Sequence, residues 1–163
     1  MKKYLIAAAA VALGAIAAPA YAQSIDGSIG VTSFDTYGVN LTAAQGILSW
    51  RSASFFGAEA EGAVGFGSEN IAPGVDIELN FEFAGYATAT ADINNNVALF
   101  GRVGYASLDV ENSLGLDLGD DGLAWGLGAK VFLDGVNGVR LDYTKYDFDN
   151  DTDVYAIAYV RRF

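Results

Sequence analysis

The stretch Val154–Phe163, VYAIAYVRRF, decides the fold of this chain. Its side chains alternate in character from start to end. One parity is large and apolar, and it comprises Tyr155, Ile157, Tyr159 and Phe163. The other parity carries small alanines and the charged Arg162. Because successive side chains of a β-strand point to opposite faces, this pattern predicts a strand that ends on an aromatic residue.

The first 22 residues have the three parts of a secretory signal peptide. Two lysines precede a nearly unbroken apolar run from Tyr4 to Ala18, and Ala20-Tyr21-Ala22 forms an A-x-A cleavage site. We therefore expect a signal peptide at residues 1–22 and one mature domain at residues 23–163. A retained membrane anchor is less favoured, since the run is shorter than the roughly 20 residues that a spanning helix needs.

The composition excludes several kinds of chemistry. Cysteine and histidine are both absent, which removes disulfides, thiol chemistry, and the commonest general base and metal ligand. The chain holds 20 Asp and Glu against 9 Lys and Arg, and its net charge is −11. Such a surface repels nucleic acid, whose binding needs clustered cationic side chains. We expect no cofactor and no nucleic-acid partner.

Alternation and turn residues divide the mature chain into eight candidate strands, each close to the roughly 9–11 residues of a tilted transmembrane strand. They are Ser24–Phe34, Thr42–Arg51, Phe56–Gly67, Val75–Thr90, Val97–Asp109, Gly122–Leu133, Gly138–Phe148 and Val154–Phe163. A chain without a later spanning helix can cross a membrane only as a closed barrel. The prediction is an all-β protein, an eight-stranded antiparallel up-and-down transmembrane β-barrel.

The direction in which the apolar parity points separates a membrane barrel from a soluble one. In one clear case, Val75, Ile77, Leu79, Phe81 and Phe83 alternate with polar residues and are expected on one face. The opposite parity of the strands combines glycines with charged residues. Those charged residues are Glu59, Glu61, Arg102, Lys130, Arg140 and Asp142. Such a mixture suits a narrow lumen, so the apolar parity is expected to face outward.

The connections fall into a short set and a longer, more acidic set, as in barrels whose termini both lie in the periplasm. The short ones are Ser52–Phe55, Ala91–Asn96 and Asp134–Asn137; the longer ones are Asp35–Leu41, Ser68–Gly74, Val110–Asp121 and Asp149–Asp153. In the third short connection, Asn137-Gly138 is expected to supply the positive φ angles of a tight hairpin.

These features together resemble the small OmpA/OmpX-like outer-membrane β-barrel proteins. The resemblance rests on the signal peptide, the eight-strand meander, the hairpin strand GVNGVRLDYTKYDF and the terminal YVRRF. It implies a monomer in the Gram-negative outer membrane, in contact with lipid and lipopolysaccharide. It also implies delivery by periplasmic chaperones to the barrel-assembly machinery, with Tyr155, Ile157, Tyr159 and Phe163 as the assembly signal. Arg161 departs from the family pattern at an outward position, and we expect no cell-wall-binding domain of the kind that full-length OmpA has.

The expected lumen charges permit two interpretations. Eight strands enclose only enough room for side chains, so Glu59 and Glu61 opposite Arg102, Lys130 and Arg140 are interpreted as a plug of buried ion pairs. The alternative is a small passive channel. Which acid meets which base depends on strand register, and the sequence does not determine the register.

Two acidic segments remain, and both are interpreted as solvated loops. The segment Asp147–Asp153 could offer oxygen ligands to a divalent ion, but as an EF-hand it fails because Thr152 stands where glycine is needed and Ala158 where glutamate is needed. The second segment holds Asp109, Glu111, Asp117, Asp120 and Asp121. It is interpreted as a hydrophilic cap over the barrel mouth, and a ligand-binding or adhesive surface is the alternative.

The expected function is therefore a non-enzymatic one in envelope integrity or surface interaction. The histidine-dependent mechanisms of enzymes with this fold do not apply to a chain without histidine. A soluble lipocalin-like ligand binder is the remaining alternative, although Ser49-Trp50 does not fit the Gly-x-Trp motif of that fold.

Overall fold

The computed structural model describes residues 24–36, 39–66, 68–72, 75–112, 120–148 and 151–163. The expected signal peptide lies outside these residues and stays a prediction. Within the described ranges, no helix is long and apolar enough to span a membrane.

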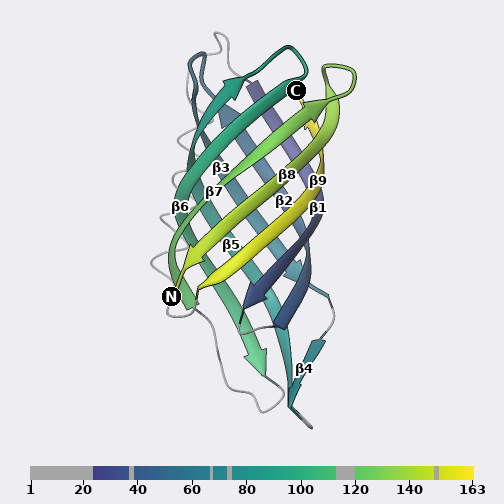
Figure 1. Cartoon of the computed structure of the whole chain (residues 1–163), viewed down its shortest axis with the longest axis vertical. Helices are drawn as coiled ribbons and strands as arrows, with labels where there is room; N and C mark the ends of the chain where they lie inside the picture. Colours follow the sequence, from purple (N-terminus) through teal and green to yellow (C-terminus); the bar gives the residue numbers. More distant parts are fainter. Residues whose placement is uncertain (1–23, 37–38, 67, 73–74, 113–119, 149–150) are drawn as a thin grey trace.

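The described residues form one antiparallel sheet that closes on itself (Figure 1). Its strands are β1 (Ser24–Thr36), β2 (Val39–Arg51), β3 (Phe56–Gly65), β4 (Ser68–Ala72), β5 (Val75–Asp92), β6 (Val97–Asn112), β7 (Asp120–Phe132), β8 (Asn137–Asp147) and β9 (Thr152–Arg162). Neighbours in sequence pair with each other except β3 and β4, β9 pairs with β1, and β3 pairs with β5. These pairings close the sheet into a ring without an unpaired edge, and the predicted meander barrel is therefore confirmed.

The strands β3 and β4 together occupy one position in the ring. Both pair with β5, which is 18 residues long: β3 pairs with Phe81–Ala89 and β4 with Val75–Glu78. The barrel therefore has eight strand positions, as expected. The expectation of a loop at Ser68–Gly74 is wrong for Ser68–Ala72, because that segment continues the hairpin with β5 beyond the barrel wall, at the bottom of Figure 1.

The two ends of the barrel differ in their connections. The three turns within 52–55, 93–96 and 133–136 lie at the end where Ser24 pairs with Arg51 and the Phe163 amide donates to the Ile25 carbonyl at 2.8 Å. We call this the short-turn end. The strand residues farthest from these turns, such as Thr36, Asp120 and Thr152, lie at the opposite end, which we call the long-loop end.

Large apolar side chains point out of the barrel, as predicted. On β7, Leu123, Trp125 and Leu127 are exposed, whereas their inward neighbours Ala124 and Lys130 are buried. This distribution is the reverse of a soluble lipocalin-like barrel, whose apolar side chains fill the interior. The alternative of a soluble apolar-core barrel is therefore wrong.

The outer wall is not uniform around the ring. Over β7, β8 and β9 it carries large exposed residues such as Trp125, Leu141 and Ile157. Over the middle of β2, β3 and β5 a group of adjacent outward positions is glycine or alanine. They include Gly46, Ala58, Ala60, Gly62, Gly85 and Ala87. A Cβ built on Gly46 or Gly85 would meet nothing within 4 Å, so this small-residue flank is open.

One alternating segment changes face partway along β5. Phe81 is exposed, as expected, but Leu79 is buried. The register with β6 shifts between these residues, because Leu79 pairs with Val110 and Phe81 pairs with Asp109. Asn80 is the extra residue of a β-bulge, and its side-chain amide donates to Asp109 Oδ1 at 3.0 Å. The expectation that Leu79 shares a face with Phe81 is wrong for this reason.

The turn between β7 and β8 also differs from its prediction. Its positive φ angle, 81°, belongs to Gly135, whereas Gly138 pairs with Phe132 in the sheet. The Asp134 carboxylate closes the turn by accepting the backbone N–H groups of Val136 at 2.9 Å and Asn137 at 2.5 Å. Gly138 is thus a strand residue, and the hairpin has a longer turn than an Asn-Gly pair would give.

Candidate functional site: the lumen charge network

The six charged residues predicted to face the lumen all do so. Glu59 and Glu61 come from β3, Arg102 from β6 and Lys130 from β7, while Arg140 and Asp142 come from β8. All are buried, and Arg140 is 0% exposed. Their strands alternate inward and outward, and every one of these residues has the inward parity. Their side chains are joined by the contacts described below, and we call this set the lumen network.

Arg140 is the centre of the lumen network. Its guanidinium donates to Glu59 through Nη1–Oε1 at 2.7 Å and Nη2–Oε2 at 2.8 Å. It also donates to Asp142, with Nη2–Oδ1 at 2.7 Å and Nε–Oδ2 at 2.8 Å, and to the Ser49 hydroxyl at 3.1 Å. The planar fork of arginine suits such paired contacts with carboxylates.

Arg102 forms a second node beside the first. Its Nη1 donates to Glu61 Oε2 at 2.5 Å, and its Nε donates to the Thr144 hydroxyl at 3.0 Å. The same nitrogen, Nη1, lies 3.7 Å from both Glu59 and Asp142, so the two nodes share carboxylates. The guanidinium carbon lies 4.4 Å from the centre of the Tyr86 ring, a cation–π contact.

Lys130 extends the lumen network toward the short-turn end. Its ammonium donates to Asp26 Oδ2 at 3.0 Å, and Arg162 approaches the other oxygen of Asp26 at 3.4 Å. The Phe100 ring makes cation–π contacts with two cations. Its centre lies 4.5 Å from the Arg140 guanidinium carbon and 5.4 Å from the Lys130 nitrogen. Each cation in this region therefore has a carboxylate partner and an aromatic face.

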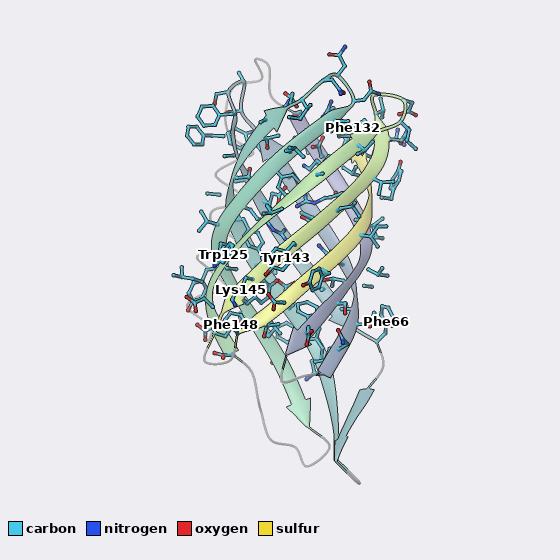
Figure 2. All side chains as sticks on the ribbon, in the orientation of Figure 1. Phe66, Trp125, Phe132, Tyr143, Lys145 and Phe148 are labelled. Carbon is cyan, nitrogen blue, oxygen red and sulfur yellow. The ribbon has the colours of Figure 1, made fainter. Side chains whose placement is uncertain are left out.

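Apolar side chains lie on both sides of the lumen network along the barrel axis. Toward the long-loop end, a buried cluster includes Phe34, Leu41, Leu79, Leu108, Tyr146 and Val154. Toward the short-turn end, the Arg162 guanidinium stacks on the buried Phe132 ring at 3.9 Å. Figure 2 shows Phe132 near one end of the barrel and Phe148, which packs against the apolar cluster, toward the other.

Several partners in the lumen network were not predicted. Asp26, Ser49, Tyr86, Thr144 and Glu82 are all buried and face the lumen. The parity of their strands could have identified them, since each lies an even number of residues from a predicted lumen residue or from a buried neighbour in the same strand. Their contacts could not have been identified, because a contact across the lumen depends on the register of every strand between.

The predicted assembly residues lie together on the outer wall of β9. Tyr155, Ile157 and Tyr159 are exposed, and Phe163 is 75% exposed. Tyr155 packs on Tyr143 of β8 with ring centres 5.3 Å apart, and the Tyr159 hydroxyl donates to Asn137. The Arg161 guanidinium lies over the Phe163 ring at 5.8 Å, which accommodates the departure from the family pattern. Their role in assembly stays a prediction.

The long-loop end is acidic. Lys145 contacts Asp151 at 2.8 Å, Tyr143 donates to Asp153 at 2.7 Å, and Tyr105 donates to Asp121. In the described part of the chain, no group of three or more acidic residues is arranged to hold a metal ion. Residues 149–150 and 113–119, which belong to the two acidic segments, lie outside the described residues.

A groove of about 330 Å³ lies near the short-turn end, and Phe100 is the residue that it shares with the surroundings of the lumen network. It is lined by Phe55, Ala89, Thr90, Ala91, Leu99, Phe100 and Gly101. The lining contains no titratable side chain, so the groove offers no acid, base or nucleophile stronger than a threonine hydroxyl.

Closure of the sheet, the outward apolar wall and the polar lumen define a transmembrane β-barrel. The family model for the outer membrane protein beta-barrel domain matches residues 6–163, and the chain belongs to that family of outer-membrane proteins. No curated protein is significantly similar to the chain in sequence.

Solved outer-membrane barrels share the fold at low sequence identity. Ail of Yersinia pestis, in complex with the heparin analogue sucrose octasulfate, has a TM-score of 0.67 and 16% identity over 88% of this chain and 100% of that chain. The N-terminal β-barrel domain of OprF from Pseudomonas aeruginosa gives 0.67 and 8% over 86% and 97%. OprG from the same organism gives 0.63 and 13% over 87% and 96%. These similarities concern the fold alone.

Proposed function

We propose that this outer-membrane barrel is a closed, non-enzymatic scaffold that acts in envelope integrity or surface interaction through its acidic long-loop end. In this proposal both termini face the periplasm and the long-loop end faces outward. The distribution of short turns and longer connections supports that orientation, since outer-membrane barrels have short periplasmic turns.

The observation that carries the proposal is the hydrogen-bonded ion pair of Arg140 and Glu59 across the lumen, which we call the brace. In the ring, β3 and β8 are four strand positions apart, so Arg140 and Glu59 join opposite sides of the wall. Apolar side chains then cover this brace toward both ends. A solute would have to separate buried charge pairs to pass, and separating such pairs is costly.

The described residues also give little support to catalysis. The carboxylates at the centre of the lumen network are engaged by arginine or lysine, and the external groove has no titratable side chain. The chain has no histidine, the commonest general base. Outside the lumen, the carboxylates of Asp35, Asp92, Asp121, Asp134, Asp147 and Asp151 are exposed to solvent near strand ends and turns.

The charge of the long-loop end indicates the kind of ligand. Ail was crystallised with a polyanion, sucrose octasulfate. In this chain the described long-loop residues include Asp35, Asp109, Asp120, Asp121, Asp147, Asp151 and Asp153, and Lys145 is already paired with Asp151. We infer that this surface favours cationic ligands, or lipopolysaccharide phosphates bridged by divalent cations, and disfavours sulfated glycans.

The same proposal includes how the barrel reaches its place. We propose that periplasmic chaperones deliver the chain and that the barrel-assembly machinery recognises the outward residues Tyr155, Ile157, Tyr159 and Phe163. The barrel then works as a monomer in contact with lipid. The exposure of Tyr155, Ile157 and Tyr159 on β9 and of Phe163 directly after it supports this proposal.

Two measurements test the function. Protein in planar bilayers should give no single-channel steps; steps of reproducible size would favour the alternative, a small passive channel.

Protein in lipid nanodiscs should bind immobilised poly-lysine in a salt-dependent manner and should not bind immobilised heparin. The double variant Asp151→Lys/Asp153→Lys should lose poly-lysine binding, and the matched Asp92→Lys variant at the short-turn end should retain it. Heparin binding by the unmodified protein would contradict the proposed surface.

A further inference from the structure

One side of the lumen has polar atoms that the lumen network leaves unused. Six buried side-chain atoms have no hydrogen-bond partner among the described residues. They are Ser28 Oγ, Thr32 Oγ1, Gln45 Nε2, Gln45 Oε1, Glu61 Oε1 and Glu82 Oε2. All five residues are more than nine-tenths buried. Buried polar groups are rarely left unpaired, so their accumulation here indicates that something polar occupies the space between them.

Strand register places three of these residues, Gln45, Glu61 and Glu82, next to one another. Across β1, β2, β3 and β5, one row of paired residues reads Gly30, Gln45, Ala63, Glu82. The adjacent inward row on the same strands reads Ser28, Ile47, Glu61, Ala84. Gln45 and Glu82 are separated by one alanine-bearing strand, or about 10 Å between backbones. Glu61 lies diagonally next to both, and small residues between them leave their side chains unobstructed.

Glu82 is also the carboxylate for which the lumen lacks a partner charge. Among the described residues, Asp26, Glu59, Glu61 and Asp142 each lie within 4.0 Å of a lysine or arginine nitrogen. Four cations make these contacts, namely Arg102, Lys130, Arg140 and Arg162. Glu82 instead accepts one hydrogen bond, from the Tyr146 hydroxyl at 3.1 Å. An unpaired buried charge is unfavourable, so the Glu82 carboxyl must either hold a proton or be accompanied by one unit of positive charge.

We propose that Glu82, Glu61 and Gln45 form an internal site for one hydrated monovalent cation such as Na⁺. The ligand set consists of hard oxygens, which suit such an ion, and the Gln45 amide nitrogen can donate to its water. One positive charge balances Glu82, whereas a divalent ion would leave an excess of charge. The inference goes beyond the proposed function, since it concerns the lumen and needs no surface ligand.

The first test compares the stability of the whole protein in two salts. Mature protein is refolded into lipid vesicles in NaCl or in choline chloride at equal ionic strength. The melting temperature of the compact gel band should be higher in NaCl, by roughly 3 °C when Na⁺ is at ten times its dissociation constant, and the rise should saturate. Equal melting temperatures in the two salts would overturn the proposal.

Variants separate a cation from a proton or a general salt effect. Glu82→Gln keeps the shape and removes the charge, so the difference between the two salts should disappear. Asp92→Asn removes an exposed rim carboxylate and should leave the difference intact. If Glu82→Gln melts higher in both salts while the unmodified protein shows no sodium effect, Glu82 is satisfied by a proton and the proposal is wrong.

A second measurement does not depend on a variant that folds. High-resolution crystals of the unmodified protein grown in NaCl should show an ion peak between Glu61 and Glu82, within reach of Gln45, that is absent from crystals grown in choline chloride. The same density in both salts, or no peak in NaCl, would overturn the site.

Discussion

Glu59 and Arg140 are 81 residues apart in sequence, yet they join opposite walls of the barrel through two parallel hydrogen bonds of 2.7 and 2.8 Å. The pair spans the lumen from β3 to β8. The Ser49 hydroxyl also donates to Glu59 Oε1, at 2.7 Å, and this oxygen accepts from Arg140 Nη1 as well. It therefore fixes the cross-section of the barrel as well as filling it.

Loss of this brace should destabilise the barrel strongly. Arg140→Met leaves Glu59 and Asp142 buried without their main partner, so the free energy of unfolding should fall by about 3–5 kcal/mol. Urea unfolding in lipid vesicles measures the change. Asp92→Asn provides the control, because the Arg51–Asp92 pair is exposed and such pairs contribute about 1 kcal/mol or less. A loss for Arg140→Met no larger than that of the control would show that the brace is not needed for stability.

Phe163→Asp should impair assembly in cells. The residue is 75% exposed on the outer wall, and Leu133, at 76%, is a matched control at the same end of the barrel. The fraction of membrane protein that shows a heat-dependent gel shift should fall for Phe163→Asp and change little for Leu133→Asp. If the two variants assemble equally well, Phe163 acts only as one apolar rim residue and the assembly-signal prediction is wrong.

Asp134 should retain its charge to unusually low pH. Hydrogen bonds from the Asn137 side chain and from the backbone N–H groups of Asn137 and Val136 lower the pKa of its carboxyl to about 2. Because the folded-state pKa is below the usual 3.8, the turn gains stability above pH 4 and loses it as the pH falls from about 4 to 2. A carboxyl titration by NMR checks the value, and Asp134→Asn should remove this pH dependence. A midpoint near 3.8 would contradict the hydrogen-bonded turn.

Single cysteines can test the bulge at Asn80, because the chain contains no other cysteine. Leu79→Cys places the thiol inside the lumen, so it should react slowly with a small maleimide in detergent. Phe81→Cys places it on the outer wall and should react much faster. Equal rates would indicate that β5 keeps one alternation through residue 80.

The sequence was sufficient for the fold and for the inward direction of the charged side chains. Both depend on a period of two, which is visible along each strand, and Arg102 and Arg140 face the lumen for that reason. Features that depend on one extra residue were not predictable in this way. The bulge at Asn80 reverses Leu79, and the turn at Gly135 makes Gly138 a strand residue. The pairing of Arg140 with Glu59 required the register of strands on both sides of the ring.

The small-residue flank over β2, β3 and β5 has a consequence in the plane of the membrane. Where Gly46 and Gly85 face outward, acyl chains can approach the backbone closely, whereas Trp125 and Ile157 hold them away on the opposite side. The barrel is therefore not a symmetric cylinder to its surroundings. Its rotation about the membrane normal determines whether a neighbouring molecule meets the small-residue flank or the wall of large apolar residues. The two sides of the barrel therefore present different surfaces within the membrane plane.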